Sequence, residues 1–191
     1  MPSVHSLQPT VWRTCRALAN RTRLHIFRLL VHRSNQTVSA IAQSLDRPLP
    51  VTSQYLRTLE ARGLLTVCRM GRQVYYRADP ATENTFELVT ALRSMLEQDA
   101  EPIETIYKLA TAFTHPRRVE IYRVLKRGPC SLEQIQIATG ISPRALARHL
   151  QKLEARGFVS ARLGKHTIVD CPNVFGRALG RLAAEEGPST E

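Results

Sequence analysis

The chain has 191 residues, of which 43% are hydrophobic and 23% charged, and its formal net charge is +11. This length fits one large or two small domains, and no segment approaches the ~20 apolar residues of a transmembrane helix. The N-terminus lacks the apolar region of a signal peptide, so we expect an intracellular protein. The positive charge favours a polyanion as partner, nucleic acid first and an anionic membrane second, over a basic surface without a partner.

The sequence contains one unit twice. Leu59–Leu65 returns as Leu153–Val159, 94 residues later, and Thr22–Leu30 returns as Arg117–Leu125, 95 residues later. The near-constant shift indicates a tandem duplication of a domain rather than a solenoid. Net charge is +6 before and +5 after residue 100, so the basic excess belongs to both copies. The predicted domains are residues 1–100 and 101–191.

The first copy has apolar residues at helical spacing, then a short hairpin, then another helix. Pro50 fits the first turn of the fourth helix, and Gly63 fits its C-terminal end. The tip of the hairpin falls at Gly71. In chain order we predict a helix from Val11, helices over 22–31, 37–45 and 50–63, strands over 64–68 and 73–77, and a helix over 82–98.

The second copy repeats this order. His115-Pro116 ends the opening helix, and Ser131 with Gln134 forms a capping-box pattern. Ser142-Pro143 has the N-cap and N1 residues expected before the next long helix. The predicted elements are a helix over 103–113, helices from 119, 131 and 142, a hairpin around 162–165, and a helix from 175.

Two helices joined by a short turn and followed by a basic hairpin are typical of a winged helix-turn-helix. The major groove admits one helix, whose outward side chains read base edges, while a hairpin reaches phosphates or the minor groove. The outward candidates for base reading are Ser53, Gln54 and Arg57 in the first copy, and Arg144, Arg148 and Gln151 in the second. The wing candidates for phosphate contact are Arg69, Arg72, Arg162 and Lys165. The repeat aligns Arg69 with Arg162 and Arg72 with Lys165.

Three segments, Ala17–Phe27, Leu56–Leu65 and Gly71–Arg77, resemble in this order the opening, the recognition-helix segment and the wing of ArsR-type transcriptional regulators. The match is looser in the second copy, and MarR-type proteins share the coarse layout. Family members are commonly homodimers packed through their first and last helices. The resemblance therefore implies a mainly α fold with small β-hairpin wings, in which two tandem winged helix-turn-helix domains form a single-chain pseudo-dimer. A homodimer of the whole chain is the alternative.

The two copies differ beside the recognition helix. Gly140 occupies a turn position where the first copy has Asp46, and Thr139 replaces the apolar Leu45. We therefore expect the copies to recognise different half-sites, or one copy to bind phosphate alone. Half-sites one helical turn apart, ~34–36 Å, would match two such helices.

The cysteines and histidines give no metal-binding pattern. The four cysteines are scattered without a CxxC pair, and we predict reduced thiols, with Cys68 and Cys171 buried. Many ArsR-like proteins bind metals through the third or last helix, but these segments lack Cys and His here, so we predict no metal and no cofactor. Cys15, on the opening helix expected between the copies, is a candidate thiol switch, against the alternative of a small buried residue.

The chain shows no nucleophile elbow, P-loop or dinucleotide fingerprint, so we predict that it is not an enzyme. The predicted function is a sequence-specific regulator that binds double-stranded DNA through two unlike recognition helices, as a repressor, in the cytoplasm at the nucleoid. No membrane partner is expected. Two alternatives stay open: a non-specific architectural DNA-binding protein, and a winged-helix module for protein interaction.

Overall fold

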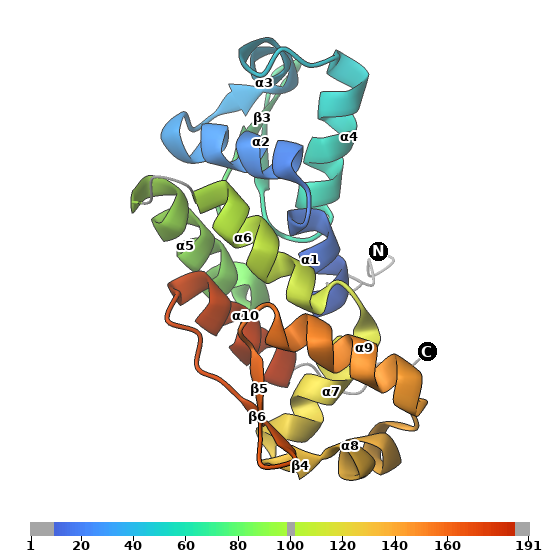
Figure 1. Ribbon diagram of the computed structural model, residues 1–191. Helices are drawn as coiled ribbons and strands as arrows, with labels where there is room; N and C mark the ends of the chain where they lie inside the picture. The colour runs from blue at the N-terminus through green and yellow to red at the C-terminus, as the bar shows by residue number, and fades with distance from the viewer. Residues whose placement is uncertain (1–9, 99–101, 186–191) are drawn as a thin grey trace, which may run out of the picture.

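The computed structural model describes residues 10–98 and 102–185. Within these ranges the chain forms ten α-helices, one 3-10 helix and six short strands, arranged as two units of the same element order. Figure 1 shows the units stacked end to end, with α1, α5, α6 and α10 between them. The predicted fold class, mainly α with small hairpin wings in two tandem units, is confirmed.

The first unit follows the predicted order with one added strand, β1. This strand has two residues and pairs with β3, giving a three-stranded sheet in the order β1-β3-β2. The elements are α1 (Val11–Leu18), α2 (Arg21–His32), β1 (Gln36–Thr37), α3 (Val38–Ser44), α4 (Leu49–Glu60), β2 (Thr66–Met70), β3 (Gln73–Arg77) and α5 (Glu83–Gln98).

The second unit repeats this arrangement with its own added strand, β4, in a sheet of order β4-β6-β5. A short 3-10 helix, η1, continues its opening helix. The elements are α6 (Pro102–Ala110), η1 (Thr111–Phe113), α7 (Pro116–Lys126), β4 (Cys130–Ser131), α8 (Leu132–Thr139), α9 (Pro143–Glu154), β5 (Val159–Arg162), β6 (Lys165–Ile168) and α10 (Val174–Glu185).

Local hydrogen bonds explain where the helices begin. The side chain of Asn20 accepts a hydrogen bond from the backbone N–H of Arg23 at 2.9 Å and so caps α2. Ser131 and Gln134 form the predicted capping box at α8, with bonds of 3.2 and 2.8 Å. Each bond satisfies a backbone donor that the helix itself leaves without an acceptor.

One hydrophobic core runs through both units. It includes the buried faces of α1 and α5 in the first unit and of α6 and α10 in the second, so the units share apolar surface. Leu18, Leu92, Ile106 and Leu179 are fully buried in this shared core. Burial of this kind stabilises a pair of small domains that would each be marginal alone.

Two sequence-based predictions about cysteines have different outcomes. Cys171 is buried, as predicted, with its Sγ packed against the bare backbone of Gly176 in α10. Cys68 is exposed, so the prediction that it is buried was wrong. The reason is its place on β2, where the side chains toward the hairpin tip project beyond the core.

Candidate nucleic-acid interface

In Figure 1 the recognition helix α4 lies toward the right of the upper unit, and α9 lies toward the right of the lower unit, above α8. Each packs its apolar stripe inward: Leu56 and Leu59 are fully buried in α4, as are Leu146 and Leu153 in α9. Because the buried residues recur at helical spacing, the remaining positions of each helix face away from the core. Each recognition helix therefore presents an outward face to solvent.

On α4 the predicted base-reading side chains form one group. Gln54 and Arg57 are exposed, while Ser53 is half-buried and accepts a hydrogen bond from Nη2 of Arg57 at 3.1 Å. Gln54 and Arg57 also line a shallow depression with Pro50, Thr58, Ala61 and Arg62. Arginine and glutamine in this setting can each make two hydrogen bonds to a base edge.

On α9 the three predicted side chains, Arg144, Arg148 and Gln151, are all exposed. Between them, His149 faces partly inward and contacts the ring of His115, which precedes α7. At the end of α9, Glu154 bonds Nδ1 of His166 in β6 at 3.1 Å. This bond ties the recognition helix to the wing.

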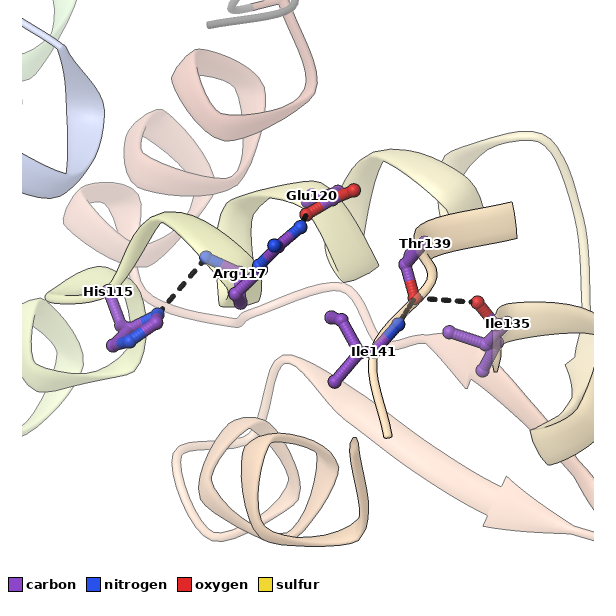
Figure 2. A network of polar contacts seen from close by, with 6 residues as sticks. All are labelled: His115, Arg117, Glu120, Ile135, Thr139 and Ile141. Atoms are coloured by element: carbon purple, nitrogen blue, oxygen red, sulfur yellow. Dashed lines mark hydrogen bonds and ion pairs between the residues drawn. The ribbon is translucent and has the colours of Figure 1, made fainter. Parts of the chain in front are cut away.

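The turns before the recognition helices accommodate the residues that differ between the copies. Asp46 and Gly140 both adopt left-handed backbone, with φ of +48° and +64°. Aspartate is one of the few residues other than glycine that enters this region readily, so the turn survives the replacement. Figure 2 shows how Thr139 closes the second turn: its Oγ1 donates to the carbonyl of Ile135 at 2.8 Å and accepts from the N–H of Ile141 at 3.4 Å.

The wings differ more than the sequence repeat indicates. Thr37 and Ser131 occupy the same place in the two units, and they pair with Tyr75 and Lys165 respectively. The strand register therefore aligns Lys165 with Tyr75, and not with Arg72.

By the same register, the Arg162–Lys165 pair of the second wing corresponds to the Cys68–Tyr75 pair of the first wing. Beyond this level the first wing continues for six residues, with Arg69 and Arg72 on the extension, whereas the second turns at once through Leu163-Gly164. The predicted equivalence of the wing cations is thus corrected. All four are exposed, but Arg69 and Arg72 stand on a wing longer by two residue pairs.

Two arginines that were not selected from the sequence tie the second helix of each unit to the end of its opening helix. Nη2 of Arg23 donates to the carbonyl of Arg16 at 2.8 Å, and its guanidinium lies 5.7 Å from the centre of the Tyr55 ring on α4. Arg118 has the same role 95 residues later, where Nη2 donates to Oγ1 of Thr114 at 2.6 Å. Burial lowers the pKa of both guanidinium groups from their ordinary value. The repeat of arginine at this shift was the available signal.

The candidate thiol switch, Cys15, lies on α1 and has no exposed surface. Helix α1 packs against η1, α6 and α7 of the second unit, so Cys15 does lie near the contact between copies. In residues 10–98 and 102–185 no group of three or more His, Cys, Asp or Glu side chains is placed to hold a metal ion. In the same ranges no helix combines the length and apolar character needed to cross a membrane.

Comparison with known families gives two matches within the chain. A family model described as a helix-turn-helix domain matches residues 18–68 and 113–160, which together make up just over half of the chain. Each match runs from the end of the opening helix of one unit, through its recognition helix, to the start of its wing. The chain belongs to the ArsR-type helix-turn-helix family.

Two curated proteins resemble part of the chain. Both are HTH-type transcriptional repressors named SmtB, from Mycobacterium tuberculosis strains CDC 1551 / Oshkosh and H37Rv, and each is 40% identical over 62 residues. The matched segment covers 32% of this chain and 45% of each relative, so the chain spans less than half of the relatives' length. The family match and these partial relatives support a DNA-binding transcriptional regulator.

One solved structure shows a weak likeness to the chain: human N-acetylserotonin methyltransferase in complex with SAM. It is 19% identical, with a TM-score of 0.33, and the match covers 75% of this chain and 43% of that one. The prediction that the chain is not an enzyme is corrected, and the exclusion of catalysis is withdrawn. The absence of known catalytic motifs from the sequence was not sufficient to exclude catalysis. The likeness is too weak to indicate any reaction for the ArsR-type chain.

Proposed function

We propose that this ArsR-type protein is a sequence-specific repressor that binds double-stranded DNA as a single chain and contacts two unlike half-sites. The observation that carries the proposal is that α4 and α9, one in each unit, expose different side chains. In α4 these are Gln54 and Arg57, whereas in α9 they are Arg144, Arg148 and Gln151. Different donors select different bases, so the two helices would favour different sequences.

The proposed division of labour follows the chemistry of the side chains. Ser53, Gln54 and Arg57 would contact bases in one half-site, and Arg144, Arg148 and Gln151 in the other. The wing cations would contact phosphates, which fixes the register of the protein on the duplex without selecting sequence. Arg69, Arg72, Arg162 and Lys165 are assigned to that task.

The domains proposed for this function are residues 1–100 and 101–191, and residues 99–101 at their junction lie outside the described ranges. The repressor role is supported by the SmtB relatives, which are HTH-type transcriptional repressors. For a chain that binds a promoter in this way we propose a place at the nucleoid, in the cytoplasm. A repressor need do no more than occupy its site and exclude polymerase.

Selection of bound duplexes from a genomic pool at ~0.15 M salt tests the proposal. We expect enrichment of an asymmetric motif with two unlike half-sites about one helical turn apart. A reporter promoter that carries this motif should be less active when the protein is present. Binding without enrichment would replace the proposal with an architectural role, and no binding would favour a protein-interaction module.

A further inference from the structure

A pair of histidines lies beside the recognition helix of the second unit. The ring centres of His115 and His149 are 4.8 Å apart, with an angle of 42° between the ring planes. His149 belongs to α9 and directly follows Arg148, one of the proposed base-reading residues. His115 precedes α7, and Figure 2 shows its ring directed at the backbone N–H of Arg117.

The cap that His115 makes fixes its protonation. Its Nδ1 accepts a hydrogen bond from the N–H of Arg117 at 3.1 Å, so this nitrogen carries no proton. The neutral ring therefore has its proton on Nε2, which is a hydrogen-bond donor. His115 can thus donate to an anion while it keeps its place at the start of α7.

The charged side chains around the two rings are mostly cationic. Arg117 and Arg118 of α7 and Arg148 of α9 lie near the ring of His149, and Lys152 and Arg156 lie near Arg118. Glu120, the carboxylate on this part of α7, is already paired with Arg117, with Nη1 and Oε2 2.9 Å apart. From the first unit, Cys15 of α1 lies near Arg118. The cluster therefore carries a local excess of positive charge.

This excess acts on the histidines. Burial, then His115 and the nearby arginines, lower the pKa of His149 to about 4. Burial and the same arginines also lower the pKa of His115. Both rings are neutral at pH 7 in the free protein, because a proton there would face several like charges. An anion placed among these groups would reverse that balance.

The first unit has no such pair. Asn20 occupies the N-cap position of His115, and Tyr55, the seventh residue of α4, corresponds to His149, the seventh residue of α9. Neither residue is a histidine, so the pair of imidazole rings is absent there. Any acid sensitivity at this place is thus confined to the second unit.

We propose that His115 and His149, flanked by Arg118 and Arg148, form a contact site for a DNA backbone phosphate, and that phosphate binding there draws a proton onto His149. The inference rests on the proposed DNA-binding function and adds a regulation to it: the second unit binds DNA more tightly as the pH falls. In the complex the negative charge of the phosphate offsets the neighbouring cations, so His149 can take up a proton at a pH at which it is neutral in the free protein.

The sign follows from linkage. The affinity rises as the pH falls from the pKa of His149 in the complex toward its lower value in the free protein. If the bound phosphate raises this pKa to ~6, the Kd at pH 5.5 is about fourfold lower than at pH 7.5. The effect requires no particular base sequence, because a phosphate is the ligand.

The test measures the Kd of the full chain for a mixed-sequence duplex of about 30 base pairs at pH 5.5 and 7.5, at constant salt. The variants are His149→Tyr and His115→Asn, which install the residues of the first unit, and the control is His32→Asn, which removes an exposed histidine of α2. We expect about a fourfold change in wild type and control, and less than about 1.5-fold in His149→Tyr.

A second measurement follows the imidazole signals of the folded wild-type chain by NMR, with and without the duplex. It is independent of how well the variants fold. A rise of the His149 pKa on binding from about 4 to about 6 supports the site. Binding with an unchanged pKa, or with the same pH dependence in His149→Tyr, overturns the inference and leaves the proposed function intact. No binding at either pH overturns both.

Discussion

Arg21 and Glu104, which belong to different units, form an ion pair with 2.8 Å between Nη2 and Oε2. The guanidinium of Arg21 also lies 4.2 Å from the centre of the Tyr107 ring. A second pair joins Arg181 of α10 to Glu87 of α5, at 2.7 Å. The cation comes from the first unit in one pair and from the second unit in the other. The two ion pairs therefore link the first unit to the second.

These ion pairs should contribute less to stability than the apolar contact they surround. Both Arg21 and Glu104 are more than half exposed, so water screens their attraction. We predict that Arg21→Ala lowers the Tm by less than about 2 °C. Ile106→Ala, at a fully buried position of α6, should lower the free energy of unfolding by ~2–5 kcal/mol. Thermal and urea denaturation measure both, and equal losses would contradict the prediction.

The close approach of α10 to α7 depends on Gly180. A Cβ at this position would lie 2.8 Å from the hydroxyl of Tyr122, whose ring is held edge-on by Phe113 and Phe158. We predict that Gly180→Ala lowers the free energy of unfolding by ~1–3 kcal/mol, although alanine has the higher helix propensity.

The matched control for Gly180→Ala is the same substitution in a Tyr122→Phe background. Without the hydroxyl, the nearest ring atom is 3.6 Å from the new Cβ, which is an ordinary contact. Gly180→Ala should then be neutral or stabilising by up to ~1 kcal/mol. Urea unfolding of the four proteins gives the coupling, and the same loss in both backgrounds would show that the hydroxyl is not the cause.

Arg148 is the side chain of α9 chosen to test base reading. On the duplex that selection enriches, Arg148→Ala should weaken binding by ~1–3 kcal/mol and relax the preference at one base pair. Arg33→Ala removes an equal charge beyond the end of α2 and serves as the control. Competition binding against single-base variants of the duplex is the measurement. An equal loss on every sequence would reduce Arg148 to a phosphate contact.

The unequal wings predict unequal salt effects. Arg72 lies in the turn of the longer wing, whereas Lys165 begins β6 at the level where Tyr75 lies in the first unit. Arg72→Ala should weaken binding to all duplexes alike and reduce the slope of log K against log salt by about one. Lys165→Ala should reduce it by less, because Lys165 stands closer to the body of the domain. A larger effect at Lys165 would contradict this view of the wings.

The thiols should react at very different rates. Cys68 is exposed on β2, whereas Cys15 and Cys171 are buried, and a buried thiol reacts only when the surrounding structure opens. In the native protein, a thiol reagent should modify Cys68 first, and Cys15 only at the rate of opening. Mass mapping of the labelled protein gives the order. Labelling of Cys15 as fast as Cys68 would contradict this prediction and would support Cys15 as an accessible thiol switch.

Helices and their starts could be predicted from the sequence because the relevant signals are local. The apolar spacing of α1 and the capping box of Ser131 and Gln134 each lie within one or two turns of chain. The outward positions of α4 and α9 follow from the same spacing. The two-residue strands β1 and β4 gave no such signal, since they form only by pairing with distant strands.

The finer differences between the units could not be predicted, because they depend on strand register and on contacts distant in sequence. Gly71 and Gly164 align in the repeat, yet one wing extends two residue pairs further than the other. The pairing of Lys165 with Ser131 decides this, and no local pattern encodes it. The contact of His115 with His149 likewise requires α7 and α9 to be placed against each other.

The central claim is that one chain contacts two unlike half-sites, and the stoichiometry of the complex tests it most directly. Native mass spectrometry on the selected duplex, combined with hydroxyl-radical footprinting, gives the number of chains and the symmetry of protection. We predict one 21.5 kDa chain per duplex and an asymmetric footprint over two half-sites about one helical turn apart. Two chains on a palindromic site with a symmetric footprint would contradict the claim.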